Sequence, residues 1–234
     1  MLVCSACEAA NPDGARFCND CGASLTAQVT ERRKLVTLLF CDMTGSTAMG
    51  ERTDPEAVRA LLVRYFDRMR GIVERHGGTV EKFIGDAVMA VFGVPLAHED
   101  DALRACRAAV EMRDALPTLG IAGRIGVNTG EVVAGTGDLL ATGDAVNVAA
   151  RLEQTARPGE VLIGELTYEL VTDAAQVEPV EPLELKGKSE PVPAYRLLGL
   201  ADGAPPSRRA QSSFTGRARQ LEELERAFRR VVDA

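Results

Sequence analysis

Several features are missing from the 234-residue sequence. It has no tryptophan, 4% aromatic residues and two histidines. No apolar run approaches the roughly 20 residues that a membrane-spanning helix needs. The net charge of -7 gives no general attraction to nucleic acid, and no GxxxxGKS/T segment is present to form a phosphate-binding P-loop. These absences argue against a membrane protein, a general nucleic-acid-binding protein and a P-loop nucleotidase.

The remaining composition is typical of a soluble globular chain. Hydrophobic residues make up 46% and charged residues 26%. The first residues, MLVCSACEAA, lack the basic segment and long apolar stretch of a secretory signal. We therefore expect a cytoplasmic location, where thiols stay reduced.

Four of the six cysteines form two Cys-x-x-Cys pairs within the first 21 residues: Cys4, Cys7, Cys18 and Cys21. One such pair alone could be a redox couple, but two in a segment with almost no core favour a tetrahedral structural Zn²⁺. The segment resembles a zinc ribbon that folds with its metal bound. Its role stays open between protein contact, nucleic-acid contact and support of a dimer. Nucleic acid is the weaker option, because Arg16 is the only basic residue before residue 32.

The middle of the chain alternates between strand and helix patterns. Asp54-Pro55 is typical of a helix start, and an apolar stripe from Val58 to Val73 follows at steps of three and four. Gly85-Asp86 separates two short apolar runs and predicts a hairpin. We expect strands at Leu35–Cys41, Thr79–Ile84, Ala87–Phe92, Ile121–Asn128, Glu131–Ala134 and Val161–Ile163, and helices after Asp54, after Asp100 and at Asn147–Thr155.

This order predicts an α+β layer fold of the ferredoxin-like, βαββαβ type, with helices on one face of the sheet. The expected divisions are a metal module at 1–26, a linker at 27–33, the main domain at 34–199, a linker at 200–212 and a terminal segment at 213–234.

Two aspartates occupy ends of predicted strands. Asp42 ends the first strand, and Asp86 lies in the hairpin turn. If that strand lies beside the hairpin, both carboxylates leave the same end of the sheet, where they suit Mg²⁺. Aspartate is also common in turns, and spacing alone favours that simpler interpretation. The small, hydroxyl-rich residues that follow offer backbone amides to phosphates: Gly45, Ser46 and Thr47.

Four segments occur in an order that resembles class III adenylyl and guanylyl cyclases: KLVTLLFCDMTGST, EKFIGDAVMAVFG, GDAVNVAARLE and LELKGKSEPVPAYRL. The resemblance covers residues 34–199 and implies two Mg²⁺ or Mn²⁺ ions per active site. It assigns metal contacts to Asp42, Met43 and Asp86, base recognition to Lys82, and a phosphate contact to Lys186. It assigns ribose orientation and transition-state stabilisation to Asn147 and Arg151.

The residue types suit this chemistry. Cyclisation joins the ribose 3′-oxygen to the α-phosphorus and expels pyrophosphate, so negative charge grows and fixed cations stabilise it. Arg151 offers a planar fork to phosphate, and Asn147, four residues earlier, shares its helix face. Taken singly, Arg151 could instead pair with Glu153 or Glu160, and Asn147 could cap a helix.

The resemblance also implies the partners. In that family the metal residues and the base, ribose and phosphate residues come from two catalytic domains, and this chain carries both sets in one domain. We therefore expect a head-to-tail homodimer with two shared sites, no membrane and no nucleic-acid partner. The substrate favoured by Lys82 is ATP, giving 3′,5′-cyclic AMP.

One position departs from the family pattern. Leu140 stands three residues before Gly143, where adenylyl cyclases usually carry Asp or Thr, and Thr142 or Asp138 could substitute. The alternative function is a catalytically weak cyclase-like domain that binds nucleotide and regulates an attached ATPase module. The segment Ser213–Phe228 resembles the start of such AAA-type or signalling ATPases, with an amphipathic surface helix as the simpler interpretation.

Overall fold

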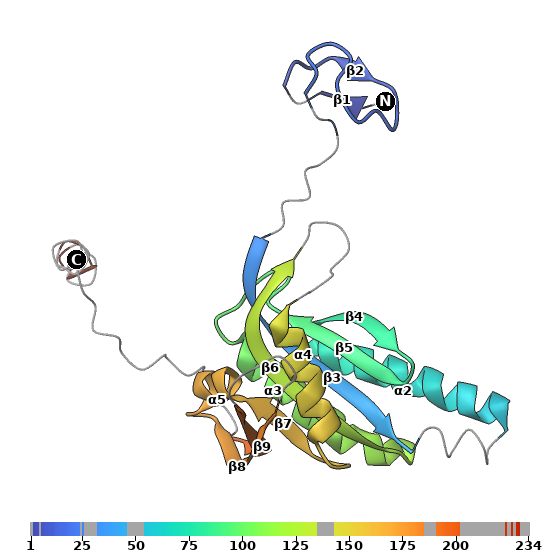
Figure 1. Ribbon diagram of the computed structural model, residues 1–234, viewed down its shortest axis with the longest axis vertical. Helices are drawn as coiled ribbons and strands as arrows, with labels where there is room; N and C mark the ends of the chain where they lie inside the picture. Colours follow the sequence, from blue (N-terminus) through green and yellow to red (C-terminus); the bar gives the residue numbers. More distant parts are fainter. Residues whose placement is uncertain are drawn as a thin grey trace.

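The computed structural model describes residues 2–4, 6–23, 25, 32–45, 54–134, 143–184, 191–201, 223, 226 and 228–229. In this part of the chain, a seven-stranded sheet has the strand order β4-β5-β3-β6-β7-β9-β8 (Figure 1). The strands of this sheet are β3 (Arg32–Thr44), β4 (Thr79–Ile84), β5 (Ala87–Phe92), β6 (Ala122–Ala134), β7 (Val161–Gly164), β8 (Ala175–Leu183) and β9 (Val192–Leu200). The helices are α2 (Pro55–Arg75), α3 (Asp101–Ala115), the short 3₁₀ helix η1 (Leu116–Leu119), α4 (Asp144–Thr155) and α5 (Glu165–Val171).

The first half of the sheet has the ferredoxin-like arrangement expected from the sequence. The order β3-α2-β4-β5-α3-β6 places β3 between β5 and β6, and the three strand pairs are antiparallel. β7 then joins β6 in parallel, and β9 and β8 extend the sheet. The α+β, βαββαβ prediction is confirmed, and the sheet is mixed.

The longest helix follows its sequence signals. The Asp54 side chain accepts a hydrogen bond from the backbone N–H of Glu56 at 2.8 Å, and Pro55 opens the helix. The side chains that α2 buries are Tyr65, Met69, Ile72 and Val73. The chain then turns back at Gly78, where a Cβ would stand 2.6 Å from the Phe92 ring.

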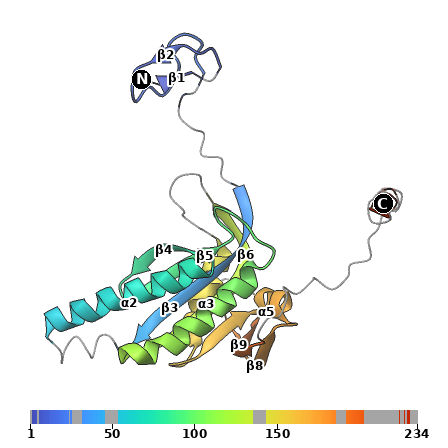
Figure 2. The same ribbon diagram turned by 180° about the vertical axis from the view of Figure 1, so that it is seen from behind.

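Helices cover both faces of the sheet, so the prediction of helices on one face is wrong. α2 and α3 lie on one face, and α4 lies on the other (Figures 1 and 2). The core on the face covered by α2 and α3 includes Leu39, Cys41 and Met43 of β3. The core on the α4 face includes Leu38 of β3 together with Ala145 and Ala149 of α4.

The prediction of two strands between Ile121 and Ala134 is also wrong. One continuous strand, β6, pairs with β3 from Ala122 opposite Thr44 to Ala134 opposite Arg32. Gly126 and Gly130 lie within it because α4 packs closely there. A Cβ at Gly126 would stand 2.3 Å from the backbone nitrogen of Glu153.

Candidate active site

The two candidate metal aspartates leave the same end of the sheet. The register of β3 and β5 runs from Thr37 opposite Phe92 to Cys41 opposite Val88. The next residue of β3 is Asp42, and the next residues back along the hairpin are Ala87 and Asp86. The expectation that the first strand lies beside the hairpin is therefore confirmed.

We call the end of the sheet that carries Asp42 and Asp86 the acidic corner. An arginine and a glutamate, which the sequence interpretation missed, also belong to it. Arg124 of β6 lies opposite Asp42 in the register and donates to its Oδ2 at 2.9 Å. The same guanidinium lies 2.6 Å from Oε1 of Glu153, on the sheet-facing side of α4. Arg124 thus ties the end of β3 to α4.

Negative charge accumulates at this corner. Burial raises the pKa of Glu153 to about 7, with Asp42 and Asp86 adding to the rise against the lowering effect of Arg124. Burial also raises the pKa of Tyr65, to which Asp42 and Asp86 again contribute. Both aspartates therefore act electrostatically on Glu153 and on Tyr65.

This corner fits divalent cations. Mg²⁺ in nucleotide enzymes commonly uses one or two carboxylates and completes its shell with substrate phosphates and water. Asp42 and Asp86 supply two carboxylates, and only Oδ2 of Asp42 has a hydrogen-bond partner among the described residues. The backbone carbonyl of Met43 lies one residue further along β3.

The candidate substrate residues lie elsewhere on the surface. Asn147 and Arg151 are exposed on α4, and the nearest partner of Arg151 is Oε1 of Gln154 at 3.5 Å. Lys82 of β4 is exposed, with its Nζ 3.8 Å from Glu81. Within the described ranges, no hydrogen bond or ion pair joins these three side chains to either aspartate.

The structure decides against two simpler interpretations. α4 begins at Asp144 with Gly143 as its N-cap, so Asn147 lies inside the helix and does not cap it. Glu153 pairs with Arg124 and Glu160 pairs with Arg196, so neither carboxylate is the partner of Arg151.

Several other candidates have less structural support. Gly45 directly follows β3, is exposed, and has a φ of 79°, a left-handed conformation that favours glycine. The remaining candidates lie outside the described residues: Ser46, Thr47, Leu140 and Lys186.

The four N-terminal cysteines come together. Their sulfur atoms all lie within 4.8 Å of one another, and this is the only such metal-ligating group in the described ranges. The Sγ atoms of Cys4 and Cys21 are 3.7 Å apart, and those of Cys7 and Cys18 are 3.6 Å apart. Four thiolates at about 2.3 Å from a tetrahedral Zn²⁺ would be separated by about 3.8 Å.

The two Cys-x-x-Cys turns also repeat each other's hydrogen bonds. The backbone N–H of Ala6 points to Sγ of Cys4, and that of Asp20 points to Sγ of Cys18, both at 3.4 Å. In each turn the residue after the second cysteine is left-handed: Glu8 with φ of 61° and Gly22 with φ of 73°. Backbone amides aimed at sulfur stabilise thiolates.

A sequence profile described as "Adenylate and Guanylate cyclase catalytic domain" matches residues 28–199. The chain belongs to this family. Among curated relatives, it is 31% identical over 186 residues to adenylate cyclase 1 of Rhizobium meliloti, covering 72% of this chain and 28% of that protein. It is 30% identical over 182 residues to the receptor-type guanylate cyclase gcy-23 of Caenorhabditis elegans, covering 70% of this chain and 17% of that protein. The chain therefore spans less than a third of either relative.

Solved structures support the same family. The adenylyl cyclase CyaB of P. aeruginosa superposes with a TM-score of 0.70 at 32% identity, covering 78% of this chain and 99% of that one. The guanylyl cyclase Cya2 gives a TM-score of 0.71 at 32% identity, covering 76% of this chain and 98% of that one. The similar proteins thus include cyclases for both purine nucleotides.

No helix in the described ranges is both long and apolar enough to span a lipid bilayer.

Proposed function

We propose that the chain converts ATP to 3′,5′-cyclic AMP and pyrophosphate with two Mg²⁺ or Mn²⁺ ions per active site. The observation that carries the proposal is the acidic corner, where Asp42 and Asp86 leave one end of the sheet beside Arg124. Bound there, the ions would activate the ribose 3′-oxygen and offset charge on the phosphates. The carbonyl of Met43 is the third proposed ligand.

The other side chains bind and orient the nucleotide. Arg151 stabilises the charge that develops on the phosphoryl oxygens, and Asn147 holds the ribose in line with the α-phosphorus. Lys82 contacts the base, and Lys186 contacts the phosphates. Gly45, Ser46 and Thr47 offer backbone amides to the triphosphate.

The active site is shared between two copies of the chain. Asn147 and Arg151 are exposed on α4 and make no contact with the aspartates in the described part of one chain. A head-to-tail, two-fold dimer would bring α4 of one subunit against the acidic corner of the other, forming two equivalent sites.

The direct test is product formation by the purified chain. ATP or GTP is supplied with Mg²⁺ or Mn²⁺, and both cyclic products are measured. We expect cyclic AMP with ATP, lowered at least about 100-fold by Asp42→Ala or Asp86→Ala. More cyclic GMP than cyclic AMP would reverse the substrate assignment. No product under any of the four conditions would favour the nucleotide-binding regulatory domain.

We also propose that Cys4, Cys7, Cys18 and Cys21 bind one structural Zn²⁺. The support is the pair of matching turns and the convergence of the four sulfur atoms, two pairs of which lie 3.7 and 3.6 Å apart. Elemental analysis of the purified chain should give one zinc per chain, and none after Cys4→Ser with Cys18→Ser. Zinc content that is unchanged in that double variant would contradict the proposal.

A further inference from the structure

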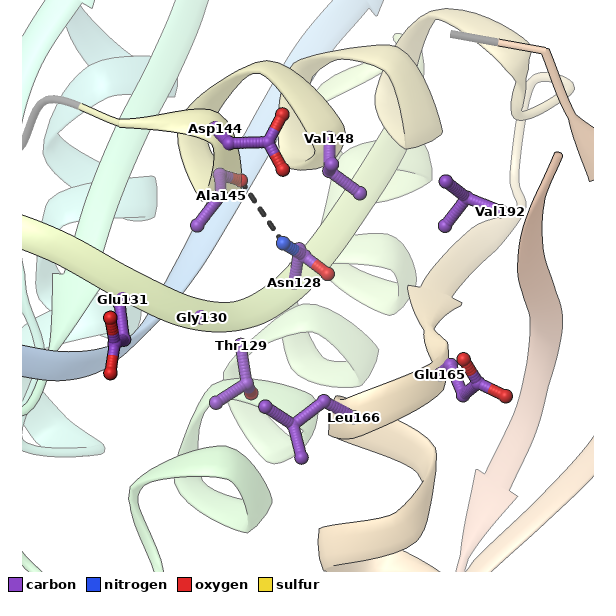
Figure 3. A pocket seen from close by; sticks show the side chains of 10 residues that line it. All are labelled: Asn128, Thr129, Gly130, Glu131, Asp144, Ala145, Val148, Glu165, Leu166 and Val192. Atoms are coloured by element: carbon purple, nitrogen blue, oxygen red, sulfur yellow. Dashed lines mark hydrogen bonds between the residues drawn. The ribbon is translucent and has the colours of Figure 1, made fainter. Parts of the chain in front are cut away.

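A cavity of about 410 Å³ lies between β6, α4, the start of α5 and the start of β9 (Figure 3). β7 pairs with β6 only between Ile125 and Val127, and the chain then turns at Gly164 into α5. From Asn128 onward, β6 therefore has no paired strand on that side among the described residues. The cavity is lined by Asn128, Thr129, Gly130, Glu131, Asp144, Ala145, Val148, Glu165, Leu166 and Val192. Its volume falls within the range of about 300–1,000 Å³ of small-molecule sites.

A buried amide points into this cavity. Asn128 is 7% exposed, and its Nδ2 donates to the backbone oxygen of Ala145 at 3.1 Å. No described residue donates a hydrogen bond to its Oδ1, which Figure 3 shows directed toward Glu165 and Val192. This acceptor is open to the cavity, so it can accept a hydrogen bond from a ligand that carries N–H groups.

Carboxylates stand at opposite ends of the cavity. Glu131 lies at one end and Glu165 at the other, with Leu166 and Val148 between them (Figure 3). Glu165 is exposed, and among the described residues the ion-pair partner of Glu131 is Arg33, at 3.8 Å. In the described part of the chain, only the cysteines converge as three or more metal ligands, so these carboxylates do not surround one ion. Asp144 also lines the cavity, beside Val148. Acidic ends, a further carboxylate and the apolar side chains of Val148 and Leu166 fit an elongated organic cation.

We propose that this cavity binds an aliphatic diamine or polyamine. One ammonium group lies between Glu165 and Oδ1 of Asn128, the methylene chain covers Val148 and Leu166, and the other ammonium group faces Glu131. Asn128 donates to the carbonyl of Ala145 in the first turn of α4, and Ala145 precedes Asn147 by two residues. An occupant that fixes Asn128 therefore fixes the helix that carries the substrate residues, and this regulatory step rests on the proposed cyclase function.

The binding test uses the full chain and 1,4-diaminobutane in isothermal titration calorimetry. We expect saturable binding at one site, about fivefold weaker in Glu165→Gln because one charge pair is lost. Glu169→Gln is the matched control, since Glu169 is exposed on the same helix and does not line the cavity. Val192→Phe, which fills the cavity while keeping every charge, should abolish binding. No saturable binding, or equal weakening in both glutamine variants, would overturn the site.

The regulatory step has a separate readout. Saturating diamine should change the rate of cyclic nucleotide formation at least twofold in the wild-type chain and in Glu169→Gln, and less in Glu165→Gln at the same concentration. Binding without any change of rate in an active cyclase would refute the coupling but leave the site. If the chain makes no cyclic nucleotide, the calorimetry still decides whether the site exists.

Discussion

Arg124 is the residue on which the acidic corner depends. It is the cation that bridges Asp42 of β3 and Glu153 of α4, at 2.9 and 2.6 Å. Glu153 is 5% exposed, and a buried carboxylate without a cation is costly. The two ion pairs of Arg124 therefore offset the repulsion between the carboxylates of Asp42 and Glu153 in the folded chain.

Replacing Arg124 by methionine keeps most of the side-chain volume and removes the cation. We expect the free energy of unfolding to fall by about 3 kcal/mol, because Glu153 and Asp42 then face each other without compensation. Urea denaturation measures the change. Adding Glu153→Gln to this variant should recover at least about 1 kcal/mol. Strictly additive losses in the double variant would show that the two side chains do not interact.

The pKa of Glu153 makes stability depend on pH. Its folded value of about 7 lies above the value of about 4.3 for an unfolded glutamate. The folded chain therefore binds the extra proton, and this contribution to stability is complete below about pH 4.3 and lost as the pH rises through about 7. Relative to Glu153→Gln, the wild-type chain should lose about 3 kcal/mol between pH 4.5 and pH 8 in urea titrations. A pH-independent difference between the two proteins would be inconsistent with a raised pKa.

How well the sequence predicts the acidic corner differs from residue to residue. The metal role of Asp42 and Asp86 is predicted by the family resemblance, since their spacing alone favours turn residues, and the ferredoxin-like order places their strands side by side. Arg124 and Glu153 are 29 positions apart, and Glu153 passed for a surface partner of Arg151. A signal was present: Glu153 follows the buried Ala149 by four residues, so it lies on the buried face of α4.

At the scale of elements, the position of α4 depends on how closely it packs on β6. A Cβ at Gly126 would stand 2.4 Å from the backbone oxygen of Ala149, so the helix would have to shift. Gly126→Ala should lower the free energy of unfolding by at least about 2 kcal/mol and reduce cyclase activity, because α4 carries Asn147 and Arg151. Thermal and urea unfolding together with the product assay measure both effects.

Gly199 of β9 is the matched control for this substitution. Nothing lies within 4 Å of a Cβ built there, so Gly199→Ala should change stability by no more than about 0.5 kcal/mol. Equal losses in the two alanine variants would show that close packing of α4 is not the cause.

The same glycines explain why β6 was predicted as two strands. Thr129-Gly130 has the appearance of a turn, since glycine interrupts an apolar pattern. In the structure, Gly130 lies in a continuous strand because a Cβ there would stand 2.7 Å from that of Ala145. The local sequence pattern does not distinguish a glycine in a turn from a glycine in a strand against which a helix packs closely. The second case depends on a helix residue that is distant in sequence, here Ala145.

At the scale of the whole molecule, the two proposed halves of the nucleotide site lie on different surfaces of one chain. The acidic corner lies at the end of β3, while Asn147 and Arg151 are exposed on α4. Two copies related by a two-fold axis would combine each corner with the helix of the other subunit. The chain would then be inactive as a monomer, and activity per chain should rise with protein concentration.

Mixing two inactive variants tests this shared site most directly. Asp42→Ala removes a proposed metal ligand, and Arg151→Ala removes the proposed phosphate contact, so each alone should form cyclic AMP at least about 100-fold more slowly. In an equimolar mixture, half of the dimers are mixed and contain one intact site, so activity should return to about a quarter of the wild-type value. A mixture no more active than its separate components would contradict a site built from two chains.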